Sequence, residues 1–168
     1  MATPTYTLID STVLGSAASS VTFSGISATG KGDLVLVMEY LANTSTADAN
    51  VQLNSDTLQN YPYVVMTGTG SSAVSGQSTT YPALRTGFDS IADTTSKHNV
   101  IMQILDYSAT DKHKSVLVRS GGAGTYDAAE AWAERWASTS AVTQIDIKTF
   151  TDAFAAGSSF YLFQIVSE

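Results

Sequence analysis

Two histidines are the residues of this chain with the clearest potential for metal binding. His98 and His113 each stand near the start of an expected strand, and the segment between them is typical of a hairpin. A hairpin could bring both imidazoles to one ion. No carboxylate stands at a spacing that would complete the ligand set, so we expect two histidines close to loops and no metal site.

Four oxygen-bearing side chains surround another expected strand, and oxygen is the ligand that Ca²⁺ prefers. They are Asp48, Asn50, Asn54 and Asp56. Their order differs from that of an EF-hand loop and lacks its distal Glu. Because Asn and Asp also close turns with their own side chains, we expect turns here, with calcium binding as the alternative.

Other catalytic arrangements have little support in the sequence. The chain has no cysteine for thiol catalysis, no Gly-x-Ser-x-Gly segment for a nucleophilic serine, and a glycine-rich stretch in which Ala73 replaces the last glycine of a dinucleotide motif. A glycosidase would need a facing pair of carboxylates, for which Asp48/Asp56 and Glu130/Glu134 are the candidates. We predict a protein that is not an enzyme, with no catalytic residue and no cofactor.

Length and charge narrow the class of protein. The 168 residues carry a net charge of −7 and suit one domain with its own core. An acidic chain lacks the basic face that neutralises nucleic-acid phosphates, so we expect no nucleic-acid partner. No apolar run approaches the roughly 18–20 residues of a membrane span, and no signal peptide is recognisable, so we expect no membrane association and a protein made in the cytoplasm.

The elements that position these residues are expected to be short strands. Ser and Thr supply about a quarter of the chain, and such residues favour strands and turns over helices. Alternation of apolar and polar residues predicts strands with one buried face. Other runs are apolar on both faces, which predicts either a second covering layer or a partner subunit. The alternating pairs include Val21/Phe23, Val51/Leu53 and Ile145/Ile147, and the runs apolar on both faces are 33–41, 99–107 and 159–166.

Clusters of Gly, Ser, Asn and Asp separate the expected strands, as in a β-sandwich or barrel. The segment 67–80 has Val74 as its one large apolar residue and predicts an exposed loop. The segment 108–113 lies between two strand-like runs and predicts a hairpin loop.

One segment supports two interpretations. Residues 127–137 are rich in alanine and begin with Asp127 and Glu130 at capping-box spacing, which favours a helix locally. The same residues alternate as a strand, and Trp132 and Trp136 share a face in either structure.

Aromatic residues in the turn-rich stretches are the best candidates for contact surfaces. Tyr61, Tyr63 and Tyr81 could close the ends of the core, form a protein interface, or provide a stacking platform for a sugar.

Three stretches of the sequence are informative when they are taken in order. They are VLGSAASSVTFSGI at 13–26 followed by DLVL at 33–36, VQLNSDTLQNY at 51–61, and SAVTQIDI at 140–147 followed by FAAGSSFYLFQI at 154–165. Together they resemble small jelly-roll virion proteins of tailed bacteriophages (capsid decoration, tail or fibre type). The resemblance spans nearly the whole chain, and one departure is Gln164 after Phe163, where the family has an aromatic residue followed by glycine.

The resemblance implies an all-β fold, a single jelly-roll β-sandwich over residues 1–168 with about 8–10 antiparallel strands. It also implies that residues 128–137 form a strand, which we adopt over the local helix. No catalytic residue is implied. Because the chain has no coiled coil or shaft repeat, we expect a capsid decoration (cement) protein that bridges major capsid subunits and stabilises the head of the virion. The alternative is a tail-tip or fibre-associated receptor-binding domain that recognises host-surface carbohydrate.

The expected partners are the major capsid protein, other virion proteins and further copies of the chain in a homo-oligomer (trimer or dimer). Residues 1–9 are polar, prone to extended structure and interrupted by proline, so they could form an N-terminal arm along a neighbour's sheet. The residues predicted for interfaces are Thr3, Pro4, Tyr6, Leu8, Tyr61, Tyr63, Tyr81, Trp132 and Trp136.

Overall fold

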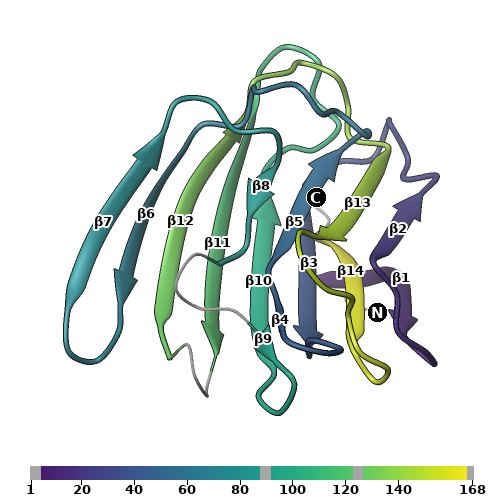
Figure 1. Cartoon of the computed structure of the whole chain (residues 1–168). Coiled ribbons are helices and arrows are strands. Elements are labelled where there is room, and N and C mark those ends of the chain that lie inside the picture. Colours follow the sequence, from purple (N-terminus) through teal and green to yellow (C-terminus); the bar gives the residue numbers. More distant parts are fainter. Residues whose placement is uncertain (1–4, 88–91, 123–126, 166–168) are drawn as a thin grey trace.

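The computed structural model describes residues 5–87, 92–122 and 127–165, and these form two antiparallel sheets packed face to face (Figure 1). The described residues contain no helix, so the predicted all-β sandwich is confirmed. In spatial order the larger sheet contains β1 (Tyr6–Val13), β14 (Ser159–Ile165), β3 (Asp33–Tyr40), β10 (His98–Ile104), β11 (Lys114–Gly122), β12 (Ala129–Trp136), β6 (Tyr63–Gly68) and β7 (Ala73–Ser78). The smaller sheet contains β2 (Ser20–Ser24), β13 (Gln144–Thr149), β5 (Ala49–Leu53) and β8 (Leu84–Arg85), and β4 (Thr46–Ala47) pairs with β9 (Ala92–Asp93).

The described residues form fourteen strands, more than the eight to ten expected. Three of the extra strands, β4, β8 and β9, are only two residues long. Such short pairings carry no periodic pattern that a sequence could display, so only the packing of the chain defines them.

The smaller sheet follows the alternation of its sequence. Val21, Phe23, Ile145 and Ile147 point into the sandwich and are buried. Their polar neighbours on β2 face outwards and are exposed, because successive side chains of a strand alternate between the two faces.

β12 is a strand, as the family resemblance implied and the local helix propensity did not. Its buried residues are Glu130, Trp132, Glu134 and Trp136, alternating with exposed residues. It pairs with β11 on one side and with β6 on the other. Long-range pairing along both edges and burial of two tryptophans outweigh the helix propensity of alanine, which amounts to tenths of a kcal/mol per residue.

The segment 67–80 was expected to be a loop, and this prediction is wrong for most of its length. Its last part forms β7, which pairs with β6 in an unbroken register from Tyr63/Ser78 to Gly68/Ala73. An edge strand exposed on both faces needs no apolar alternation, so its sequence resembles that of a loop. The hairpin connection expected at 108–113 is confirmed between β10 and β11.

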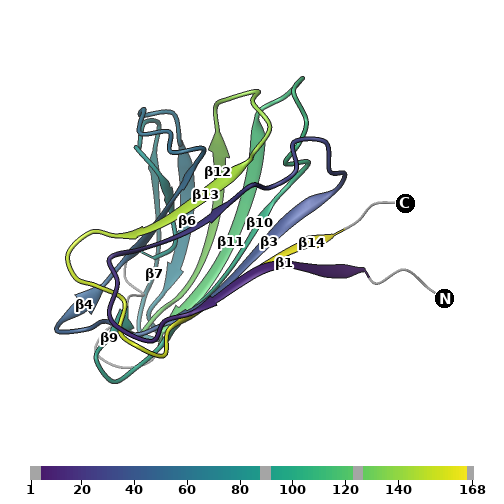
Figure 2. The same cartoon turned by 90° about the vertical axis from the view of Figure 1, so that its right-hand side faces the viewer.

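The N-terminal residues 6–9 belong to β1 in the structure of the single chain. Among the described residues β1 pairs with β14 alone and forms one edge of the larger sheet (Figure 2). Thr3 and Pro4 lie outside the described residues. An arm that pairs with a neighbouring molecule therefore stays a prediction.

Candidate functional site

The outer face of the larger sheet, turned away from the smaller sheet, carries two cross-strand rows of mainly apolar side chains, interrupted by Gln103 and Arg119. The strand registers align these rows across the sheet. We call the two rows together the outer apolar face. One row contains Val64, Ala133, Leu117, Gln103, Val35, Phe163 and Leu8, and the other contains Met66, Ala131, Arg119, Ile101, Val37 and Tyr161.

The side chains that β6 and β11 contribute to these rows include some that are open to solvent, whereas Val35 on β3 is buried. Met66 is 67% exposed, Val64 53% and Leu117 51%. The small Ala131 and Ala133 leave two shallow hollows beside Leu117, of about 310 and 200 Å³. An apolar face of this extent is typical of a surface that contacts a partner.

The charges on this face are unlike those of the whole chain. Over β10, β11, β12 and β6 the outward positions include Arg119 and Arg135 and no carboxylate. The chain as a whole has a net charge of −7. This part of the outer apolar face is therefore suited to a partner whose matching surface is apolar with acidic groups at its rim.

Two of the predicted interface residues lie at the β1 end of this face. Leu8 is 51% exposed opposite Phe163, and Tyr6 is 57% exposed with its ring against Phe163 at a centroid distance of 6.5 Å. The sequence pattern that selected them was a polar, strand-forming N-terminus, whereas the structure relates them to the apolar rows.

Three other predicted interface residues are buried in the monomer. Tyr61, Trp132 and Trp136 are at most 2% exposed. Tyr61 stacks on Trp136, whose indole Nε1 donates to Asp56 Oδ2 at 2.7 Å. Packing within the core therefore accounts for these aromatic residues without a partner.

Tyr63 and Tyr81 lie half-buried next to Trp132. Their rings meet edge to face at 5.8 Å, and Tyr63 meets Trp132 at 5.1 Å. A hollow of about 260 Å³ opens beside Tyr63 along the inner side of β6 and β7, with Val65, Thr67 and Gly76 in its lining. This hollow combines an aromatic edge, an apolar floor and hydroxyl groups.

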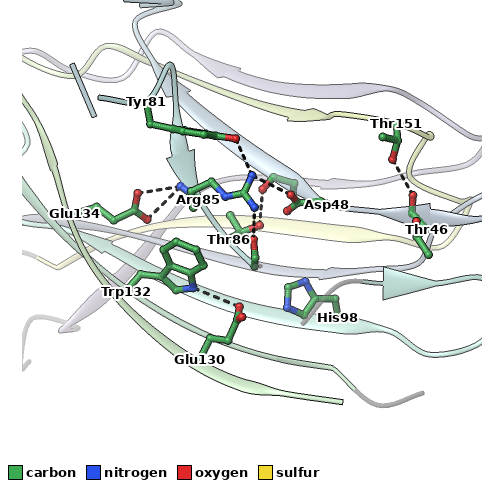
Figure 3. A network of polar contacts seen from close by, with 12 residues as sticks. Thr46, Asp48, Tyr81, Arg85, Thr86, His98, Glu130, Trp132, Glu134 and Thr151 are labelled. Atoms are coloured by element: carbon green, nitrogen blue, oxygen red, sulfur yellow. Dashed lines mark hydrogen bonds and ion pairs between the residues drawn. The ribbon is translucent and has the colours of Figure 1, made fainter. Parts of the chain in front are cut away.

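A network of buried polar residues crosses the interior near β8 (Figure 3). The Arg85 guanidinium pairs with Asp48 Oδ2 at 3.1 Å and donates to Tyr81 Oη at 2.8 Å. The Arg85 backbone N–H donates to both carboxyl oxygens of Glu134, at 2.9 and 3.1 Å. These bonds fasten the short β8 to β12, which belongs to the other sheet.

Burial changes the acidity of both carboxyl groups in this network. It raises the pKa of Asp48 to about 6, although the Arg85 charge lowers it. It raises the pKa of Glu134 to about 8, against the opposing effects of the Arg85 N–H and the Arg85 charge. Desolvation outweighs the favourable partners because both groups are taken almost fully out of water.

Tyr40, Thr86 and His98 form a second group of buried polar residues. Tyr40 Oη lies 2.7 Å from His98 Nδ1 and 3.5 Å from the Thr86 hydroxyl. Burial lowers the pKa of His98 to about 4, so the imidazole is neutral at neutral pH. His98 Nε2 is buried without a hydrogen-bond partner among the described residues.

The histidine pair considered from the sequence does not form. His98 pairs with Gly122 at one end of the β10–β11 hairpin. His113 immediately precedes Lys114, which follows the turn at the opposite end. The length of the hairpin separates the two rings, because a strand advances about 3.3 Å per residue.

The Glu130/Glu134 pair lacks the accessible, facing arrangement of a hydrolytic site. Glu130 and Glu134 share the inner face of β12, and both are about 5% exposed or less. Glu130 accepts hydrogen bonds from Thr67 and Trp132, whereas Glu134 is bonded to Arg85. Each carboxyl group is thus engaged by the fold and closed off from the surface.

Three of the four side chains considered for calcium serve separate structural contacts, whereas Asn50 is buried and its Oδ1 has no hydrogen-bond partner among the described residues. Asn54 caps the start of β13 by accepting from the Thr143 and Gln144 backbone N–H groups at 2.8 and 3.1 Å. Asp48 pairs with Arg85, and Asp56 accepts from Asn60. In the part of the chain that the structure describes, no three His, Cys, Asp or Glu side chains gather as a metal site.

Sequence reasoning missed two features of this surface and its interior. The outer apolar face depends on the order and register of strands far apart in the chain, and no local pattern encodes it. The role of Arg85 depends on β8, which is too short to be predicted. For the outer apolar face, the sequence signal was the presence of runs that are apolar on both faces.

Comparison with known proteins adds little to this geometry. No protein-family model and no curated protein matches the chain. The crystal structure of exo-inulinase from Aspergillus awamori aligns with a TM-score of 0.42 at 12% identity, over 95% of this chain and 29% of that one. The chain thus spans less than a third of that protein's length, and a likeness this weak has no bearing on function. Among the described residues no helix is long and apolar enough to cross a membrane.

Proposed function

We propose that the protein is a non-enzymatic structural protein of a bacteriophage particle that decorates the capsid. Its role is to bind the major capsid protein through the outer apolar face and stabilise the head. The observation that carries the proposal is the exposure of Val64, Met66 and Leu117 in adjoining positions on one sheet face. The sequence resemblance to small virion proteins supplies the context of a phage particle.

The physical properties of the chain suit this role. A sandwich with a packed interior is a rigid body that can bridge neighbouring subunits without losing much entropy on binding. Arg119, within the outer apolar face, and Arg135, on the same side of β12, would orient the face on an acidic surface. The net charge of −7 keeps many free copies apart before assembly.

Copy number tests the proposal first. We expect the protein in purified virions at a copy number comparable to that of the major shell protein. Quantitative band intensities give the ratio. A ratio below about one copy per ten shell subunits contradicts decoration, because closed capsid symmetry repeats a decorating site at every equivalent position.

Rebinding to particles stripped of the protein tests the surface. We expect Leu117→Glu to abolish attachment, since a carboxylate would be buried in an apolar contact. Leu58→Glu is the matched control, because Leu58 is 68% exposed and lies away from the outer apolar face. Equal attachment of the two variants would contradict the proposal.

The hollow beside Tyr63 supports a second candidate, recognition of host-surface carbohydrate by a tail-tip or fibre-associated protein. Sugars bind proteins through aromatic stacking together with hydroxyl groups, and both are present there. A glycan array with wild type and Tyr63→Ala tests it. Glycan binding that Tyr63→Ala removes, with virion copies at tail-like numbers, would replace the first candidate.

A further inference from the structure

The larger sheet ends in a free strand edge at β7. β7 pairs with β6 on one side, and no strand of the described residues pairs with it on the other. Ala73 to Gln77 are exposed, with Val74 53% exposed. In Figure 1 the β6–β7 hairpin forms the side of the larger sheet opposite β1. A strand in this position presents unpaired backbone N–H and C=O groups in the geometry that another strand recognises.

This edge lies in the longest uncharged part of the chain. No Asp, Glu, Lys, Arg or His occurs between residues 57 and 84. The remaining residues carry the whole net charge of −7. Two copies of an anionic protein therefore meet least electrostatic repulsion when they approach through β6 and β7.

β7 also lacks the features that keep strand edges from pairing. It contains no proline and no charge, and its register with β6 has no bulge. The opposite edge, β1, has both a register irregularity between Leu8 and Asp10 and a charged residue there. Bulges and edge charges are the usual protection against unwanted pairing, so one edge of this sheet is protected and the other is open.

We propose that two copies of the chain form a two-fold dimer by antiparallel pairing of β7 with its counterpart. A segment can pair with itself in this direction because an isologous contact places the same residues on both sides of the axis. The backbone hydrogen bonds of the new pair satisfy the groups left free on each β7. The result is a continuous sheet of sixteen strands, twice the eight of one copy.

The symmetry of this dimer has a consequence for the outer apolar face. A two-fold axis perpendicular to the sheet keeps the outer face of both copies on the same side. Val64 and Met66 of one copy are then separated from those of the other only by the two β7 strands, which lie about 4.8 Å apart. The dimer would therefore present a double-length apolar face. The proposal of this dimer is based on the β7 edge and does not depend on the proposed capsid role.

Analytical ultracentrifugation of the purified full chain tests the dimer. We expect a concentration-dependent mass approaching twice 17.7 kDa. Ser75→Lys and Ser75→Glu, each alone, should weaken self-association at least about tenfold, because like charges then lie across the axis. An equimolar mixture of the two variants should associate again. Ser11→Lys on β1 is the matched control and should behave as the wild type.

Several outcomes would overturn this inference while leaving the capsid proposal open. They are a monomer at all concentrations up to about 1 mM, a trimer, a dimer unaffected by Ser75→Lys, or a mixture that stays monomeric. Thermal melting shows whether each variant is folded. Gln77→Lys, at another exposed β7 position, replaces Ser75→Lys if that variant does not fold.

Discussion

The two faces of the larger sheet are both rich in apolar side chains, but only one has a covering layer. On the inner face Leu36, Met38 and Val118 are at most 1% exposed beneath the smaller sheet. On the outer face Leu117 and Met66 are half or more exposed. The same strands supply both sets, since adjacent residues point to opposite faces. The difference shows that apolar content alone does not identify a core, and that a face without a covering layer is the place to look for a partner.

The largest expected effect contrasts one residue from each face. Trp132→Ala on the inner face should lower the free energy of unfolding by about 3–5 kcal/mol, because it removes a large fully buried side chain. Leu117→Ala on the outer face should change it by less than about 1 kcal/mol. Urea unfolding of both variants measures the difference. Similar losses would mean that the outer face is already covered in the free protein.

The second prediction compares the removal of a charged side chain from the interior with its removal from the outer apolar face. Arg85→Met should destabilise the fold by about 3 kcal/mol, because Asp48 loses its buried partner and must take up a proton. Arg119→Met on the outer apolar face should leave the unfolding free energy within about 0.5 kcal/mol of wild type. Thermal and urea unfolding at neutral pH compare them. An equal effect of both substitutions would contradict the structural role assigned to Arg85.

The effect of pH is the smallest when it is taken per pH unit, and it is confined to the inner side of the larger sheet. The pKa of Glu134 is raised from 4.5 to about 8, so its contribution to stability is complete below pH 4.5 and is lost as the pH rises through 8. Asp48, with its pKa raised to about 6, acts in the same direction. His98 acts oppositely, because its pKa is lowered to about 4 and its contribution is lost as the pH falls below 6.5 towards 4.

Glu134→Gln removes one of these titrations. We expect the variant to lose less stability than the wild type between pH 5 and 8, where Glu134 contributes a slope of up to about 1.4 kcal/mol per pH unit. Urea unfolding at several pH values gives the slopes. Asp152→Asn is the control, because Asp152 is a partly exposed loop residue whose pKa is lowered and which does not titrate in this range. Parallel curves for wild type and Glu134→Gln would show that Glu134 is ionised throughout.

Several elements could be predicted because their pattern is local. The alternation at Val21/Phe23 and Ile145/Ile147 predicted the strands of the smaller sheet, and the turn residues at 108–113 predicted a hairpin. The segment 67–80 could not be predicted in this way. Its β7 strand exists because β6 offers an edge, and nothing in its own composition requires a strand.

The candidate surface was predictable only in outline. Runs apolar on both faces at 33–41, 99–107 and 159–166 indicated a second face that needs either a covering layer or a partner subunit. Which residues form that surface depends on β6, β11 and β12 lying beside those runs in one register. The interface residues Tyr61, Trp132 and Trp136 were chosen for their aromatic character, and the structure uses them in the core.

The sequence by itself determined the all-β class and the faces of the longer strands, because these follow from side-chain period and turn chemistry over a few neighbouring residues. The tertiary structure alone decided the order of strands, the short β8 with its Arg85 network, the open β7 edge and the outer apolar face. Each of these depends on pairing between segments far apart in the chain. Pairing partners are selected by the packing of the whole core, which no local window of sequence contains.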